Sequence, residues 1–203
     1  VSVQVSKSPE VIYIYLACLR ANLIFHPLNT AYKETELSFF LEDAKPSVFI
    51  CDQEIFDNIA SLKLTTVPTD IFTLLPDQQG TIYNLRQEGE HTIKDCSNDH
   101  TATLLYSSGT TGKPKGIMLS HGNIRSNAYA LKDAWEFKPD DCLLHALPIY
   151  HVHGLFVALG CALLSGSKVF WLDAFNPDDV IDALPNCTVM MGVPTYYLSL
   201  IHI

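Results

Sequence analysis

Short apolar, β-prone segments alternate with helical segments along most of the 203 residues, and this alternation narrows the possible folds more than any other feature. A helix between two strands carries the chain back to the start of the next strand, so neighbouring strands run parallel. We therefore predict an α/β fold with layered, mostly parallel sheets flanked by helices. The strands are expected at residues 1–5, 23–25, 47–51, 64–67, 101–106, 117–119, 141–147, 168–172 and 188–191.

Two of the intervening helices have clear start signals. Ser8-Pro9-Glu10 and Asn176-Pro177-Asp178 each supply a capping residue, a proline at the first helical position and an acid in the first turn. The other helices are predicted from their apolar periodicity. The full set is expected at 11–22, 33–44, 53–61, 121–135, 152–164 and 177–184.

Residues 68–100 have the weakest pattern. Proline, glycine and acidic residues there predict loops around a short helix near residues 82–87. We therefore expect a partial first α/β subdomain at 1–100, with this irregular connection at its end. Residues 101–203 are expected to form a strand pair around a polar loop and the start of a second α/β subdomain.

The composition excludes several classes of protein. Asp and Glu outnumber Lys and Arg by 22 to 13, so the basic surface typical of nucleic-acid-binding proteins is not expected. The apolar content of 48% excludes a disordered chain, and the longest apolar run, residues 154–164, is too short to span a membrane. The six cysteines lack CxxC spacing, which favours small buried side chains in a reducing compartment. We expect a cytoplasmic protein, or a mitochondrial-matrix protein in a eukaryote.

The most informative segment is the polar loop between Tyr106 and Gly116, Ser-Ser-Gly-Thr-Thr-Gly-Lys-Pro-Lys. Glycines let the backbone turn its N–H groups toward an anion, hydroxyls donate to phosphate oxygens, and lysines supply positive charge. The loop therefore predicts a polyphosphate site, although such loops can also be simple turns. Its glycine spacing matches neither a P-loop NTPase nor a dinucleotide-binding motif.

A second dense segment runs from Pro148 to Gly154 and contains His151 and His153. The His-x-His pair could bind a metal, but no third ligand follows at a suitable spacing. A histidine at a helix start that bonds to the backbone is an equally ordinary explanation. The segment Met191–Tyr196 follows a predicted buried strand, where an α/β fold commonly binds its ligand, and it could equally be only a helix start.

The run from Tyr106 to Gly116 resembles the phosphate-binding signature of the adenylate-forming superfamily, which includes acyl-CoA synthetases, luciferases and peptide-synthetase adenylation domains. The resemblance implies that ATP, with Mg²⁺ on the nucleotide, activates a carboxylic acid as acyl-AMP before its transfer to a thiol such as CoA. It implies a catalytic role for Lys115 as well as phosphate binding. The phosphate-binding residues that it implies are Ser107, Ser108, Gly109, Thr110, Thr111, Gly112, Lys113 and Lys115.

The same resemblance covers the second segment. It places a Pro-aromatic-His-x-x-Gly motif beside the acyl pocket, with the histidine near the carboxylate, and it implies no protein-bound metal. His151 is thereby implied as a catalytic residue. The substrate-side residues that it implies are Tyr150, His151, Gly154, Gly192, Val193 and Pro194.

Within the superfamily, residues 145–158 and three shorter segments resemble the malonyl-CoA synthetases. Malonate, or a similar short acid, is therefore the substrate that the resemblance implies. Its distal carboxylate would need a cation, but none of Arg20, Arg86 and Arg125 is identified as that contact. The alternatives are another acyl or aryl acid–CoA ligase, an adenylation domain, or an inactive nucleotide-binding fragment.

Members of this superfamily are considerably longer. The chain resembles a fragment of their large N-terminal domain, without the C-terminal domain and its catalytic lysine. We therefore expect the chain to need the remainder of its own polypeptide, and to be inactive without it. The expected partners are small molecules, namely the acid, ATP and CoA.

Overall fold

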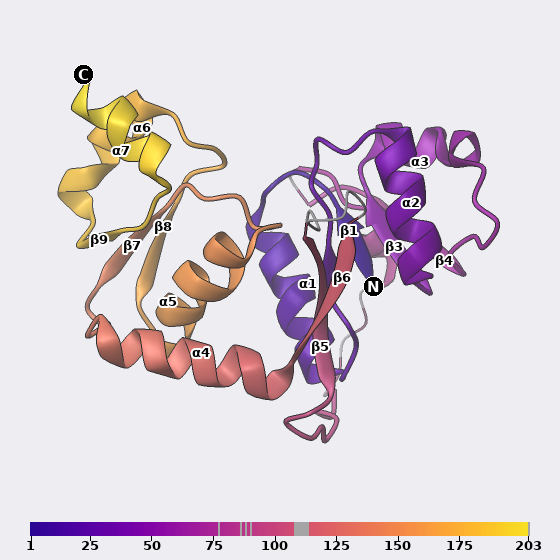
Figure 1. Ribbon diagram of the computed structural model, residues 1–203, viewed down its shortest axis with the longest axis horizontal. Helices are drawn as coiled ribbons and strands as arrows, with labels where there is room; N and C mark the ends of the chain where they lie inside the picture. Colours follow the sequence, from indigo (N-terminus) through magenta and orange to yellow (C-terminus); the bar gives the residue numbers. More distant parts are fainter. Residues whose placement is uncertain (77, 86, 88, 90, 108–113, 203) are drawn as a thin grey trace. The chain divides into compact units, whose positions relative to one another are not determined.

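The computed structural model describes residues 1–76, 78–85, 87, 89, 91–107 and 114–202 (Figure 1). It divides into two units, Val1–His121 and Gly122–Ile203. The first unit contains a four-stranded parallel sheet and an antiparallel strand pair, and the second contains a three-stranded parallel sheet. The predicted α/β fold with mostly parallel sheets and flanking helices is therefore confirmed. The predicted subdomain boundary after residue 100 stays a prediction for the intact protein.

The parallel sheet of the first unit has the strand order β2-β1-β3-β4. Its strands are short, and each one is followed by a loop or a helix. They are β1 (Ser2–Gln4), β2 (His26–Pro27), β3 (Val48–Cys51) and β4 (Asp70–Thr73). The helical segments of this unit are α1 (Pro9–Arg20), α2 (Glu34–Ala44), α3 (Gln53–Asp57), η1 (Ile59–Leu62) and η2 (Thr81–Leu85).

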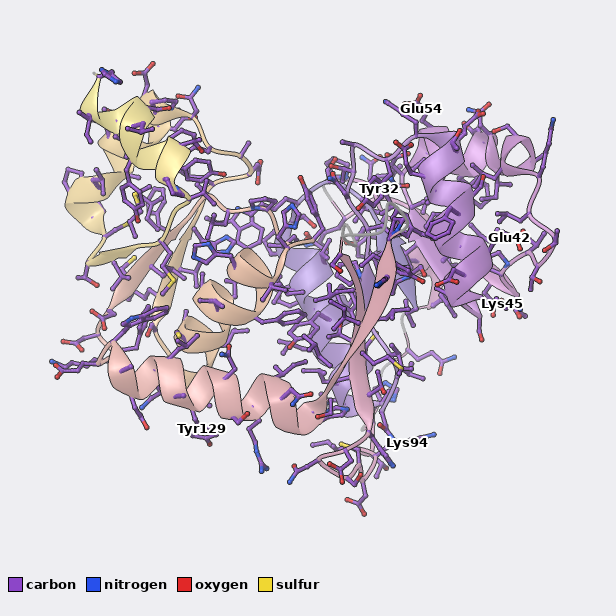
Figure 2. All side chains as sticks on the ribbon, in the orientation of Figure 1. Tyr32, Glu42, Lys45, Glu54, Lys94 and Tyr129 are labelled. Atoms are coloured by element: carbon purple, nitrogen blue, oxygen red, sulfur yellow. The ribbon has the colours of Figure 1, made fainter. Side chains whose placement is uncertain are left out.

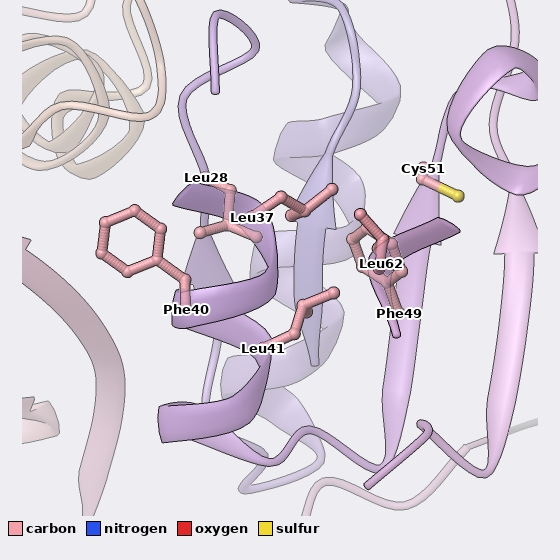
Figure 3. Packing of buried hydrophobic residues seen from close by; sticks show 7 residues of the cluster. All are labelled: Leu28, Leu37, Phe40, Leu41, Phe49, Cys51 and Leu62. Carbon is pink, nitrogen blue, oxygen red and sulfur yellow. The ribbon is translucent and has the colours of Figure 1, made fainter. Parts of the chain in front are cut away.

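The core of this unit lies between α2 and β3. Leu37, Phe40 and Leu41 recur at helical spacing, so they occupy one face of α2 and pack on Phe49 of β3 (Figure 3). All of these side chains are buried. The remaining buried members of the cluster are Leu28, Cys51 and Leu62.

The antiparallel pair consists of β5 (Thr101–Ser107) and β6 (Lys115–Ser120). Strand β5 is tied to the segment that leads into β2. The N–H of Phe25 donates to the carbonyl of Ala102 over 2.9 Å, and the N–H of Leu104 donates back to the carbonyl of Phe25 over 3.0 Å. These bonds hold the first half of β5 against the segment that enters the parallel sheet.

The second unit is built on the parallel strand order β8-β7-β9. Leu143 and Leu144 of β7 are fully buried in separate clusters, as expected for neighbouring residues of a strand covered on both faces. The elements are α4 (His121–Ala134), β7 (Cys142–His145), η3 (His153–Ala158), α5 (Leu159–Ser165), β8 (Lys168–Trp171), α6 (Pro177–Ala183), η4 (Leu184–Asn186), β9 (Val189–Met190) and α7 (Pro194–Ile201).

The predicted start of α6 is confirmed. The side chain of Asn176 accepts hydrogen bonds from the N–H groups of Asp178 and Asp179 over 2.9 and 3.3 Å, and Pro177 opens the helix. The start of α1 is only partly as predicted. Ser8 is the capping residue there, but its side chain makes no capping hydrogen bond.

Two predicted strands are wrong. Residues 23–25 are not a strand, because Leu23 and Ile24 are almost half exposed and β2 begins only at His26. Residues 64–67 lie outside the sheet as well, and β4 pairs with β3 further along the chain, inside the segment predicted as irregular. The Glu42 carboxylate on α2, labelled in Figure 2, accepts hydrogen bonds from the N–H and hydroxyl of Thr65. These bonds hold residues 64–67 against the helix instead.

None of the helices in the described ranges is both long enough and apolar enough to cross a membrane.

His26 is a buried histidine at the start of β2. Its Nδ1 lies 2.8 Å from the hydroxyl of Ser2, the residue is only 3% exposed, and its ring lies beside that of Tyr106. Burial is the main cause that lowers the pKa of His26 to about 4, and the positive N-terminus lowers it further. The imidazole is therefore neutral in the folded protein at pH 7.

We expect the free energy of unfolding to decrease as the pH falls from 6.5 to about 4. Across this window His26 is protonated in the unfolded chain but not in the folded chain. The free energy of unfolding therefore falls by about 1.4 kcal/mol for each unit that the pH drops. Urea unfolding at several pH values measures how the free energy of unfolding depends on pH. In His26→Asn, the contribution of His26 to this pH dependence should be absent. An NMR titration in which the His26 ring protonates at pH 6.5 or above would contradict the assignment.

Candidate functional site

The strand pair β5–β6 fixes both ends of the polar loop. Its antiparallel register pairs Ser107 with Lys115 and Tyr106 with Gly116, so the two ends of the loop lie on neighbouring strands. Ser107 and Lys115 are both exposed. The predicted phosphate-binding residues Ser108, Gly109, Thr110, Thr111, Gly112 and Lys113 lie outside the described residues.

Tyr106 anchors the strand that leads into the loop. Its hydroxyl donates to the Asp43 carboxylate over 2.6 Å, and its ring packs on those of Phe40 and His26 at centroid distances of 4.7 and 5.4 Å. Desolvation, followed by the hydrogen bond and charge of Asp43, raises the pKa of Tyr106. A neutral tyrosine thus links β5 to α2 directly before Ser107. The sequence offered no sign of this link, since Asp43 is 63 residues away.

The second segment begins at the carboxyl end of β7. The last residue of that strand, His145, is buried and stacks on Trp171 of β8 at a centroid distance of 5.3 Å. Its Nε2 lies 3.0 Å from the carbonyl oxygen of Gly154. A carbonyl oxygen can only accept, so Nε2 carries the proton and donates. His145 therefore ties the segment 146–154 back to the strand from which it starts.

Gly154 lies in an unusually crowded place. A Cβ atom there would be 2.2 Å from the carbonyl oxygen of Pro148, closer than any real contact. This close approach requires glycine.

The helix that follows is also different from the prediction. Residues 152–164 do not form one α-helix, because His153–Ala158 is a π-helix that continues into α5. The N–H of Leu159 bonds to the carbonyl of Gly154, five residues back, as in a π-helix. The Gly154 carbonyl therefore accepts one hydrogen bond from the backbone and one from His145. Wide turns of this kind are frequent at functional sites.

Tyr150 and His151 precede the π-helix, with their ring centroids 4.7 Å apart. His151 is an exposed residue, yet the surrounding protein desolvates its imidazole enough to lower its pKa. A histidine with a lowered pKa is neutral at pH 7 and can accept or donate a hydrogen bond. His151 thus has the accessibility and the protonation state that a ligand contact needs.

The third predicted segment, 191–196, follows β9 and begins α7. Val193 is the capping residue and Pro194 is the first residue of the helix, as predicted. Gly192 leaves room for Tyr196, because a Cβ atom there would lie 3.1 Å from the ring. Tyr196 in turn stacks on Phe175 at a centroid distance of 3.8 Å.

The structure brings the second and third segments close to each other. The pKa of Tyr196 is raised by burial and by the nearby charge of ionised Tyr150. Tyr150 of the second segment and Tyr196 of the third therefore lie near enough for the charge of one to act on the other. Tyr196 belongs to this predicted segment but is not one of the residues predicted individually to contact the substrate. Ser107 and Lys115 belong to the first unit and the six other described site residues to the second.

Among the described residues, no group of three or more His, Cys, Asp or Glu side chains is placed to hold a metal ion.

We expect Gly154→Ala to lower the free energy of unfolding by about 1–3 kcal/mol, because the new methyl group must push the Pro148 carbonyl aside. Gly160→Ala in α5 is a matched control. Its Cβ would lie 3.6 Å from that of Ala128, an ordinary contact, so this change should be neutral or stabilise the helix by up to about 1 kcal/mol. Thermal unfolding of both variants measures the difference. Equal effects of the two substitutions would show that the Pro148 contact does not require glycine.

The chain is similar to several CoA ligases. It is 32% identical over 199 residues to a probable CoA ligase of Humulus lupulus, covering 87% of this chain and 32% of that protein. It is also 32% identical over 181 residues to the mitochondrial malonate–CoA ligase of Xenopus laevis, covering 86% of this chain and 31% of that protein. The chain thus spans about a third of the length of these relatives.

A solved structure has the same fold over the whole chain. ATP-bound MatB from Rhodopseudomonas palustris superposes with a TM-score of 0.93 at 43% identity, covering 100% of this chain and 40% of that one. The sequence model of the family described as AMP-binding enzyme matches residues 1–202. The chain therefore belongs to the AMP-binding enzyme family.

Proposed function

We propose that the intact protein is an ATP-dependent acid–thiol ligase that activates malonate as malonyl-AMP and transfers it to CoA. The observation that carries the proposal is the strand pair β5–β6, which joins Ser107 and Lys115 across the base of a Ser/Thr/Gly/Lys loop. The loop resembles the phosphate-binding signature of adenylate-forming enzymes. The relatives named as malonate–CoA ligases support the choice of acid.

In this proposal the loop binds the β- and γ-phosphates of ATP. Negative charge develops on the pyrophosphate as the carboxylate attacks the α-phosphorus, so cationic and N–H donors there lower the barrier. Lys115 supplies positive charge from the first residue of β6, and Ser107 supplies a hydroxyl from the last residue of β5. The Tyr106–Asp43 hydrogen bond acts indirectly, because it holds β5 in place.

The acid binds, in this proposal, near Tyr150, His151 and the turn at Gly192. These residues come from the carboxyl ends of the neighbouring parallel strands β7 and β9, where α/β folds commonly bind ligands. A neutral His151 can donate a hydrogen bond to the carboxylate or the adenylate without neutralising the nucleophile. Gly154 contributes through the backbone, because its contact with Pro148 fixes the segment that precedes the π-helix.

In this proposal Mg²⁺ reaches the site on the nucleotide, with its phosphate oxygens as ligands. There it would neutralise phosphate charge. CoA would then attack the acyl group of the adenylate. The two described arginines, Arg20 and Arg125, are both exposed, and neither is assigned as the contact for a second carboxylate. We propose a cytoplasmic or mitochondrial-matrix location, and one relative is named as mitochondrial.

The test is a comparison of acids with the full-length protein. ATP–pyrophosphate exchange and CoA-thioester formation should be fastest with malonate, compared with acetate, benzoate and octanoate. Preference for a monocarboxylate would reject malonate but keep the adenylating class, whereas no exchange with any acid would reject the class. The 203-residue chain alone should give no exchange.

Lys115→Ala in the full-length protein should lower kcat/KM for ATP by about 10-fold to 150-fold. A hydrogen bond to a charged group is worth about 1.5–3 kcal/mol, and this one would be strongest when the pyrophosphate charge develops. Lys132→Ala is a suitable control, since Lys132 lies on α4 and its ammonium is 3.5 Å from the neighbouring Asp133. Steady-state kinetics should show no change for the control. An unchanged kcat/KM for ATP in Lys115→Ala would contradict the proposal that this loop binds the phosphates.

His151→Ala should lower kcat/KM for malonate by about 100-fold or more, the usual range for a lost acid–base or hydrogen-bonding histidine. The KM for ATP should stay within about twofold of its original value, because the lost contact is with the acid. His91→Ala, at an exposed position, serves as the control. Loss of bound zinc in His151→Ala, or a rise in the KM for ATP alone, would contradict the assignment.

A further inference from the structure

Cys142 and Cys187 of the second unit lie at the starts of two neighbouring strands. Cys142 is the first residue of β7, and Cys187 lies two residues before β9. The charge and a hydrogen bond of Cys142 both act on the thiol of Cys187. Both residues are partly exposed, and neither is in a disulfide. Cys18, Cys51 and Cys161 are buried as the sequence predicts, but the prediction is wrong for the exposed Cys96 and for the partly exposed Cys142 and Cys187.

The backbone holds this pair together. Strands β7 and β9 are parallel neighbours, and the N–H of Thr188 donates to the carbonyl of Cys142 over 3.0 Å. The hydroxyl of Thr188 accepts from the N–H of Cys142 over 2.9 Å and donates to the Asp141 carboxylate over 2.7 Å. Three hydrogen bonds thus hold Thr188, the residue after Cys187, against Cys142 and Asp141.

The two thiols also share one face of the sheet. Leu144, two residues after Cys142, packs in the cluster formed with Val180 and Ala183 of α6, and Cys187 packs against that same cluster. Because side chains two residues apart on a strand point to the same face, Cys142 faces this side as well. Cys161 belongs to the cluster around Leu143, the neighbour whose side chain points the other way.

We propose that Cys142 and Cys187 form a reversible disulfide, and that this pair is a redox modification site of the protein. The oxidant is a small disulfide such as oxidised glutathione. One cysteine thiolate attacks a glutathione sulfur and releases glutathione thiolate, which leaves a mixed disulfide on the protein. The second cysteine then loses its proton and attacks the protein-bound sulfur, releasing the second glutathione. Two protein thiols are oxidised, and one glutathione disulfide is reduced to two thiols.

The environment of Cys187 makes this reaction slow at neutral pH. Desolvation is the main cause that raises the pKa of Cys187 to about 11, and the charge and hydrogen bond of Cys142 add to it. A thiolate is the attacking species, so the step in which Cys187 attacks should accelerate as the pH rises from 7 to 9.

The bond would not touch the acid-binding segments directly. Cys142 starts β7, whereas the segment that contains Tyr150 and His151 follows the other end of that strand. The disulfide would instead close the segment that contains η3, α5, β8 and α6 into a loop. Closing a loop of this kind restricts the unfolded chain, which should raise the unfolding midpoint by several degrees.

The experiment uses the full-length protein with Cys96→Ser, which removes an exposed thiol. The protein is equilibrated in glutathione buffers of increasing oxidised fraction at pH 8, alkylated, digested and analysed by mass spectrometry. We expect a linked peptide pair that contains Cys142 and Cys187 and that disappears on addition of dithiothreitol. Cys142→Ser and Cys187→Ser should each abolish the pair and leave glutathione on the remaining cysteine.

Cys161→Ala is the matched control, because it removes a buried cysteine from the opposite face of the same sheet. It should leave the Cys142–Cys187 linkage unchanged. Two results would overturn the proposal. In one, both cysteines stay reduced in every buffer. In the other, they carry separate glutathiones while the protein remains folded by circular dichroism.

Discussion

Parallel pairing of β7 with β9 is the constraint on which the acid-side segments depend. The register Leu143–Val189 and Leu144–Met190 makes the two strands end at the same edge of the sheet. The segments that follow them, 146–154 and 191–194, therefore start side by side even though they are far apart in the chain. The influence of Tyr150 on Tyr196 is the result. The pairing also sets the other edge, where Cys142 and Cys187 meet.

The phosphate side follows a different rule. An antiparallel pair can close with a short connection, so β5 and β6 hold a loop whose two ends are neighbours. Such a loop can present several backbone N–H groups to one anion. Tyr106 adds a tie to α2 through Asp43, at the residue before Ser107. Rigid strands thus carry the groups on both sides of the loop.

Much of this could be predicted from sequence, and the failures have physical reasons. The alternation of strands and helices was sufficient to predict the α/β fold, because the spacing of apolar residues in each segment indicates which face of a strand or helix is buried. Residues 64–67 look like a strand, but a side-chain contact from Glu42 to Thr65 holds them elsewhere, and such contacts leave no periodic pattern. For the site, residue types indicated phosphate and carboxylate chemistry. A distant partner such as Asp43 could not be found from the sequence, because only the fold brings it near Tyr106.

The π-helix after His151 has a consequence for how the chain is phased. Each residue of a helix advances the side chains by about 100°, so one extra residue in a turn rotates everything after it by about that angle. Leu155 and Phe156 lie in the wide turn, Cys161 and Ala162 lie after it, and all four are buried. The rotation moves the apolar stripe of α5 relative to that of the wide turn. One continuous helix can thus pack its apolar side chains in two different directions, one before and one after the wide turn.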